Sequence, residues 1–218
     1  MDQHRTILQA MKFIHTVPED TFSYEKLKSL FELYQDSISP ILTEKRFPMD
    51  QWIEHPPFLL EGKDVEELLV HGEEIVFFGA TLGMTWERKL MELSISDPKE
   101  GFFLDGLLSA IVEERLNMFQ EELSKEVRPK YVTDRFSPGY GDLPFSQQRK
   151  WGELLDIRKT LGVQFTDRDL MIPRKTVLAL CVITKEKPLY RHRGCDSCLL
   201  YKECPLRIKG SRCSIYGG

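Results

Sequence analysis

The strongest structural signal in the sequence is a helix start followed by a long amphipathic run. Asp97 can serve as the N-cap, Pro98 suits the first helical position, and Glu100 is placed to complete a capping box. The pattern predicts one long helix up to about residue 123, and its apolar side is interrupted by acidic residues. The apolar side comprises Leu104, Leu107, Leu108, Ile111 and Val112.

Short apolar runs predict the strands. Residues 75–80 (IVFFGA) and 176–184 (TVLALCVIT) are strand-length and rich in β-branched side chains. Further strands are expected over residues 131–136 and 163–166. Residues 40–58 contain several prolines and predict an extended stretch. The remaining helices are expected over residues 6–14, 23–38 (with Ser23 as N-cap), 65–70, 85–93 and 146–161.

The order of these elements favours one fold class. The strands are too far apart for a series of hairpins, and they lack a regular β-α-β alternation with glycine-rich phosphate turns. We therefore expect a single α+β domain with a twisted, largely antiparallel sheet flanked by helices. A small Cys-rich tail would follow it.

Composition and charge argue against nucleic-acid binding and against binding to anionic membranes. The chain has 218 residues, of which 41% are hydrophobic and 29% charged, so it can bury an ordinary globular core. A net charge of -4 argues against a nucleic-acid partner and against an anionic membrane. The N-terminus is charged from its second residue and has no apolar region of signal-peptide length, so we expect a cytoplasmic protein.

The segment RFSPGYG, residues 135–141, has the character of a ligand-binding turn. Pro138 and Gly139 suit the central positions of a type II turn, and glycine lets a ligand approach the backbone. Arg135 stands at an expected strand end, where its guanidinium can take a carboxylate. Tyr140 offers a ring and a hydroxyl group. The plain alternative is an ordinary turn with Arg135 in a surface ion pair.

Glu113 is a second candidate for ligand binding. It lies in the expected long helix, next to apolar residues that should face the core. A carboxylate there can receive the ammonium group of an amino-acid ligand. Because Glu114, Glu121 and Glu122 are close by, the alternative is a solvated acidic face of the helix.

Together these segments resemble the activation domain of cobalamin-dependent methionine synthase and its stand-alone relatives. The resemblance is carried by RFSPGYGDLPFSQQRKW and LGVQFTDRDLMIPRKTV, and upstream by FFGATLGMTWERK and FFLDGLLSAIVEE. It covers residues 75–184 well and the first 70 residues loosely. It implies an activation domain over residues 1–190, whose helical N-terminal part covers about residues 1–70. The clustered cysteines mark residues 191–218 as a Cys-rich tail, an addition that the family does not need.

By position, the resemblance implies a set of residues that bind S-adenosylmethionine. Glu113 would hold the amino group of the ligand, with Glu114 as the alternative one residue along. The family also has a tyrosine just after its Met-x-Pro segment, where this sequence has Leu180 and Cys181. The turn residues that would contact the ligand are Arg135, Ser137, Gly139 and Tyr140.

The resemblance further implies a reaction and a partner. In the family, inactive cob(II)alamin is returned to methylcobalamin by one electron and a methyl group from S-adenosylmethionine. That methyl donor already carries a good leaving group, so the protein mainly positions it and no catalytic side chain is expected. The cobalamin-binding motif Asp-x-His-x-x-Gly is absent from the sequence. The cobalamin is therefore expected on the cobalamin-binding subunit of a separate methionine synthase.

The tail carries four possible thiolate ligands. The first pair has the spacing used for zinc and iron–sulfur ligation. Basic neighbours favour the thiolate form and would suit an acidic electron donor such as flavodoxin or ferredoxin. The alternatives are a structural zinc knuckle or reduced cysteines in a terminal segment. The four candidate ligands are Cys195, Cys198, Cys204 and Cys213.

Two other functions compete with reactivation at this stage. The chain would be a non-enzymatic adaptor if the tail holds a metal or iron–sulfur cluster and docks on a corrinoid protein. A visible absorption band from an anaerobic preparation distinguishes that adaptor. A methyltransferase acting on another acceptor is disfavoured, because the sequence has no glycine-rich turn of the Rossmann type.

Overall fold

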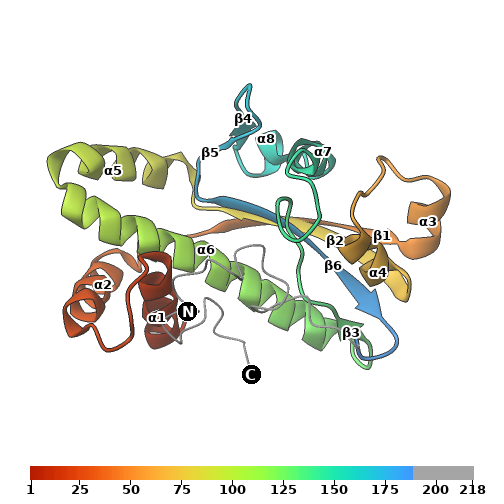
Figure 1. Ribbon diagram of the computed structural model, residues 1–218, viewed down its shortest axis with the longest axis horizontal. Coiled ribbons are helices and arrows are strands. Elements are labelled where there is room, and N and C mark those ends of the chain that lie inside the picture. The colour runs from red at the N-terminus through yellow and green to blue at the C-terminus, as the bar shows by residue number, and fades with distance from the viewer. Residues whose placement is uncertain (189–218) are drawn as a thin grey trace.

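The computed structural model describes residues 1–188, which form a central sheet between two layers of helices (Figure 1). The sheet has four antiparallel strands in the order β1-β2-β6-β3. This confirms the expected α+β fold with an antiparallel sheet flanked by helices. The strands are β1 (Ile41–Pro48), β2 (Gly72–Thr81), β3 (Tyr131–Val132) and β6 (Thr176–Thr184).

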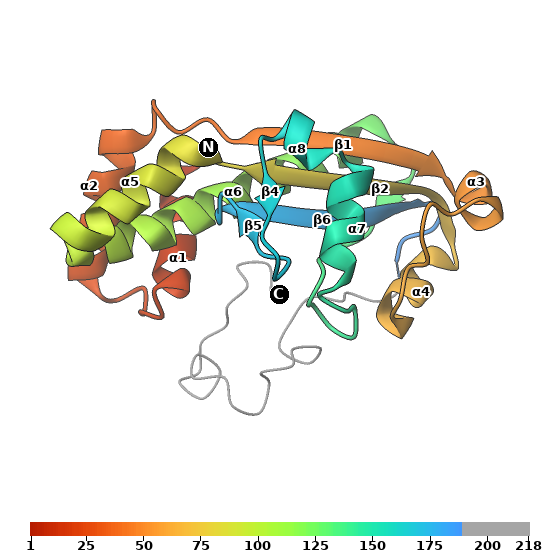
Figure 2. The same cartoon turned by 90° about the horizontal axis from the view of Figure 1, so that it is seen from above.

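Each face of the sheet is covered by its own set of helices (Figures 1 and 2). One layer consists of α1 (Gln3–Phe13), α2 (Thr21–Tyr34), α5 (Gly83–Ser96) and α6 (Pro98–Glu126). The other consists of α3 (Met49–Glu54), α4 (Lys63–Leu69), α7 (Gln147–Leu154), α8 (Ile157–Thr160) and a small hairpin of β4 (Gln164–Phe165) and β5 (Met171–Ile172).

The two central strands are buried on both faces because their side chains alternate between two apolar clusters. In β2, Val76 and Phe78 join the cluster on the α6 side of the sheet. Ile75 and Phe77 join the cluster under α3, α4 and α7. This two-sided burial explains why both strands consist of nearly continuous apolar residues in the sequence.

The long helix α6 begins as predicted and runs one turn beyond the predicted end. The Asp97 carboxylate accepts the backbone N–H of Glu100 at 3.0 Å, and Pro98 occupies the first turn. The expected capping box is wrong in one respect, because the Glu100 side chain pairs with Lys26 of α2 at 2.9 Å. That contact joins α2 to the start of α6.

The cap of α2 was predicted at the wrong residue. Asp20, not Ser23, is the N-cap, and its carboxylate accepts both the backbone N–H and the hydroxyl of Ser23. Ser23 lies three residues inside, where its own N–H is one of the donors that need a cap. The helix therefore begins at Thr21, two residues before the predicted start.

Three further segments differ from the expectation. The strand expected over residues 131–136 is reduced to Tyr131–Val132. The proline-rich stretch contains the edge strand β1. Its consecutive charged residues Glu44, Lys45 and Arg46 interrupt the alternation of apolar and polar side chains that would have predicted a strand. The single helix expected over residues 146–161 is divided into α7 and α8 at Asp156, which has a φ of +50°. Aspartate is among the few residues that adopt this left-handed conformation readily.

The Asp20 cap makes the stability of the protein sensitive to acid. Hydrogen bonds from Ser23, and then from the Thr16 hydroxyl, lower the pKa of the Asp20 carboxyl below its usual 3.8. Because the pKa is lower in the folded state, the ionised carboxylate stabilises the fold at pH values above the unfolded-state pKa. This stabilisation is lost as the pH falls through the folded-state pKa. We expect Asp20→Asn, which keeps a cap, to lose less thermal stability than wild type between about pH 5 and pH 2. Melting curves across this range test it, and parallel pH profiles would contradict it.

Within residues 1–188, no helix combines the length and the apolar character that a membrane crossing demands.

Candidate functional site

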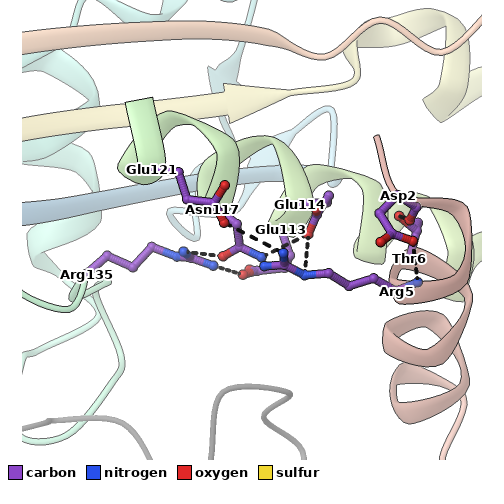
Figure 3. A network of polar contacts seen from close by, with 8 residues as sticks. All are labelled: Asp2, Arg5, Thr6, Glu113, Glu114, Asn117, Glu121 and Arg135. Carbon is purple, nitrogen blue, oxygen red and sulfur yellow. Dashed lines mark hydrogen bonds and ion pairs between the residues drawn. The ribbon is translucent and has the colours of Figure 1, made fainter. Parts of the chain in front are cut away.

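Arg135 projects from the chain after β3 and reaches across to α6 (Figure 3). Its backbone is fixed by Phe136, whose N–H and C=O both bond to Leu180 of β6 at 2.8 Å. Phe136 is buried in the cluster on the far side of the sheet. Because neighbouring side chains of an extended segment point in opposite directions, Arg135 is directed toward α6. Its side chain is only 10% exposed.

Three side chains on one face of α6 hold the guanidinium group. Nη1 of Arg135 donates to Asn117 Oδ1 and to Gln120 Oε1, each at 2.7 Å. Nη2 forms an ion pair with Glu113. The spacing of these positions places them on one helix face. Asn117 and Gln120 were not among the predicted site residues, although their positions four and seven residues beyond Glu113 indicate the same helix face.

The two neighbouring glutamates have different surroundings. Glu113 is 28% exposed and meets Arg135, as the sequence analysis required of a shared site. Glu114 is buried at 7% exposure and turns toward α1, where Arg5 Nε lies 3.4 Å from its Oε2. The geometry therefore favours Glu113, because Glu114 faces Arg5 of α1 instead of Arg135.

The glycine turn has the predicted conformation. The Tyr140 N–H donates to Ser137 O at 3.0 Å, and Gly139 has a φ of +86°, which a type II turn requires at that position. The Tyr140 ring packs edge-on against Phe136, with 5.3 Å between ring centroids. The structure thus brings Arg135 to Glu113, but the Tyr140 ring packs against Phe136, which belongs to the apolar cluster under α3, α4 and α7.

Asp142 anchors this turn to α4. Its carboxylate accepts the backbone N–H groups of Lys63 at 2.7 Å and Asp64 at 3.3 Å, so it caps a helix distant in the sequence. Gly62 and Gly141 permit the approach. A Cβ on Gly62 would lie 2.8 Å from Asp142, and one on Gly141 would lie 2.4 Å from Asp64.

We expect Asp142→Ala to destabilise the protein by about 1 kcal/mol, as loss of a helix cap does. Asp142→Asn should keep most of the stability because asparagine also caps helices. Urea unfolding of both variants measures the difference. Equal stability of the alanine variant and wild type would show that the cap contributes nothing.

The surface of the described part of the chain contains two open pockets, each of about 420 Å³. One lies between α7, α8 and β4, in the layer opposite α6, and its wall contains none of the candidate residues. The wall of the other likewise contains none of the predicted ligand-binding residues, but it adjoins the Arg135 site because Asn117 and Gln120 line it. Its volume is within the usual range of small-molecule sites. The rest of its wall includes Ser124, Arg128, Thr133 and Asp134.

The remaining sequence expectations fall on buried or undescribed residues. Leu180 and Cys181 are fully buried in β6, so neither replaces the tyrosine of the family at a ligand surface. The expected metal ligands Cys195, Cys198, Cys204 and Cys213 lie outside residues 1–188. Among the residues that the structure describes, no group of three or more His, Cys, Asp or Glu side chains could hold a metal ion.

Comparison with known proteins identifies a shared fold. The crystal structure of the MetH reactivation domain bound to AdoHcy matches with a TM-score of 0.61 and 14% sequence identity. The match covers 97% of this chain and 83% of that chain. No protein-family model matches the sequence, and no curated protein sequence matches it.

Proposed function

We propose that this chain binds S-adenosylmethionine and supports the reductive methylation of cob(II)alamin on a separate methionine synthase. The observation that carries the proposal is the nearly buried guanidinium of Arg135, held against Glu113 beside the Phe136 bridge and followed by a glycine turn. The shared fold of a reactivation domain bound to AdoHcy supports the same ligand class.

The Arg135–Glu113 pair suits a ligand that carries both charges of an amino acid. A carboxylate entering the site gains Arg135, and an ammonium group gains Glu113, so the zwitterion replaces both halves of the pair. Glu113 is the more exposed partner and can turn outward, while Asn117 and Gln120 keep Nη1 of Arg135 in place. A ligand with only one of the charges would leave the other residue unpaired, which is costly where burial is high.

The chemistry requires positioning more than acid–base catalysis. One electron reduces cob(II)alamin to cob(I)alamin, which then takes the methyl group of the sulfonium and leaves S-adenosylhomocysteine. The contribution of this chain is to hold the donor so that its methyl group faces the corrinoid. The corrinoid is bound by the partner subunit, and the electron comes from a flavodoxin or ferredoxin. We also propose that the four tail cysteines bind a zinc ion or an iron–sulfur cluster, which is separate from the S-adenosylmethionine site.

Calorimetry with S-adenosylmethionine and S-adenosylhomocysteine tests the first half of the proposal. Binding of both ligands is expected, and no heat change at millimolar ligand would contradict it. The second half is tested with a methionine synthase that lacks its activation domain. After oxidation, this enzyme should regain activity only when the chain, the methyl donor and a reducing system are all present.

A further inference from the structure

We infer that Glu114 is a positioning residue for Arg135 and acts through the side-chain amide of Asn117. This inference rests on the proposed function, because it concerns the residue that would take the carboxylate of the ligand. Glu114 does not touch Arg135 itself. Figure 3 shows it between Arg5 of α1 and Asn117, with Arg135 on the other side of Asn117.

The side chain of Asn117 has to face in one direction for the site to work. Its Oδ1 accepts from Arg135 Nη1 at 2.7 Å, and its Nδ2 donates to Glu114 Oε2 at 3.2 Å. An amide turned by half a rotation would present its NH₂ group to the guanidinium, and two donors would then face each other. The Glu114 carboxylate accepts only, so it selects the orientation that Arg135 needs.

Glu114 is itself held in place by the N-terminal helix. Its Oε2 lies 3.4 Å from Arg5 Nε, and its side chain is only 8% exposed. Burial keeps solvent from competing for this oxygen, and the arginine stabilises its charge. A chain of contacts therefore runs from α1 through Glu114 and Asn117 to Arg135, so residues that do not touch the ligand help to define its binding group.

The test compares two glutamates of α6 that each pair with an arginine. Glu122 lies 3.8 Å from Arg115 Nη1 and is 61% exposed, and unlike Glu114 it is not the partner of the Asn117 amide. We expect Glu114→Ala to weaken the binding of S-adenosylhomocysteine by roughly five- to tenfold. Glu122→Ala should bind as wild type does. Glu114→Gln should recover most of the affinity, because its amide oxygen can still accept from Asn117.

A double-mutant cycle separates positioning from a general loss of stability. If Glu114 acts through Asn117, the variant with both Glu114→Ala and Asn117→Ala should bind no more weakly than Asn117→Ala alone. Additive losses in this cycle would overturn the inference. So would equal affinities of Glu114→Ala and wild type. Melting curves of all variants show whether each one is folded at the assay temperature.

A second measurement keeps this inference distinct from the proposed function. If wild type itself does not bind the ligand, the proposed function fails. The positioning role is then decided by the side-chain ¹⁵N signals of Arg135 in the free protein. Its guanidinium protons should exchange faster with solvent in Glu114→Ala than in wild type and Glu122→Ala. Equal exchange in all three proteins would overturn the inference without reference to any ligand.

Discussion

Replacing Arg135 by alanine should weaken the binding of S-adenosylhomocysteine by about 100-fold or more. The variant removes the guanidinium that would pair with the carboxylate of the ligand, and it removes one hydrogen bond from Asn117 Oδ1 and one from Gln120 Oε1. Glu113 remains as an unpaired carboxylate that would repel the incoming one. Titration calorimetry measures the change in Kd.

The control is an arginine in the opposite layer that also pairs with a carboxylate but is more exposed. Arg149 pairs with Asp169 at 2.6 Å and donates to the Thr166 carbonyl at 2.9 Å. Arg149→Ala should therefore bind S-adenosylhomocysteine as wild type does. If Arg135→Ala also retains its affinity, the carboxylate of the ligand does not bind at Arg135 and the proposed site is wrong.

Replacing Phe77 by alanine should destabilise the protein by about 3–5 kcal/mol, the usual cost of deleting a core phenylalanine. Phe77 is fully buried in β2, and its ring packs against Trp52 and Trp151, each 5.2 Å away between ring centroids. Phe47 and Phe58 also pack against it, at 6.2 and 6.0 Å. Because four aromatic rings meet at this position, the cavity left behind cannot easily collapse.

Thermal melting measures the effect of this substitution. For a chain of this size, the expected loss lowers Tm by roughly 6–20 °C. Phe102→Ala is the control, since Phe102 is 54% exposed on α6 and its loss should cost less than about 1 kcal/mol. A similar decrease in Tm for both variants would mean that the aromatic cluster around Phe77 contributes no special stability.

The elements that could be predicted from the sequence are those with strong local signals. The start of α6 was predicted correctly because Asp97 and Pro98 determine it locally. β6 was predicted over its full range because both of its faces are buried, which leaves no polar residue to interrupt the run. The turn at Pro138 and Gly139 was predicted because its backbone conformation strongly favours glycine.

The parts that could not be predicted depend on contacts between distant segments. β1 is an edge strand recognisable only by its pairing with β2. Asp142 caps α4 across 79 residues of sequence, which no local pattern reveals. In the site, the meeting of Arg135 and Glu113 was expected from the family resemblance. The roles of Asn117 and Gln120 required knowledge of which face of α6 lies toward Arg135.

The polar partners of Arg135 have a consequence for how the site can change shape. Glu113, Asn117 and Gln120 all belong to α6, a helix of 29 residues, so the geometry of that helix fixes their spacing. Arg135 comes from a different segment, tied to β6 by the bridge at Phe136. Any widening or narrowing of the site must therefore come from movement of residues 133–143 relative to α6. Ligand binding should slow amide hydrogen exchange in that segment and leave the middle of α6 unchanged.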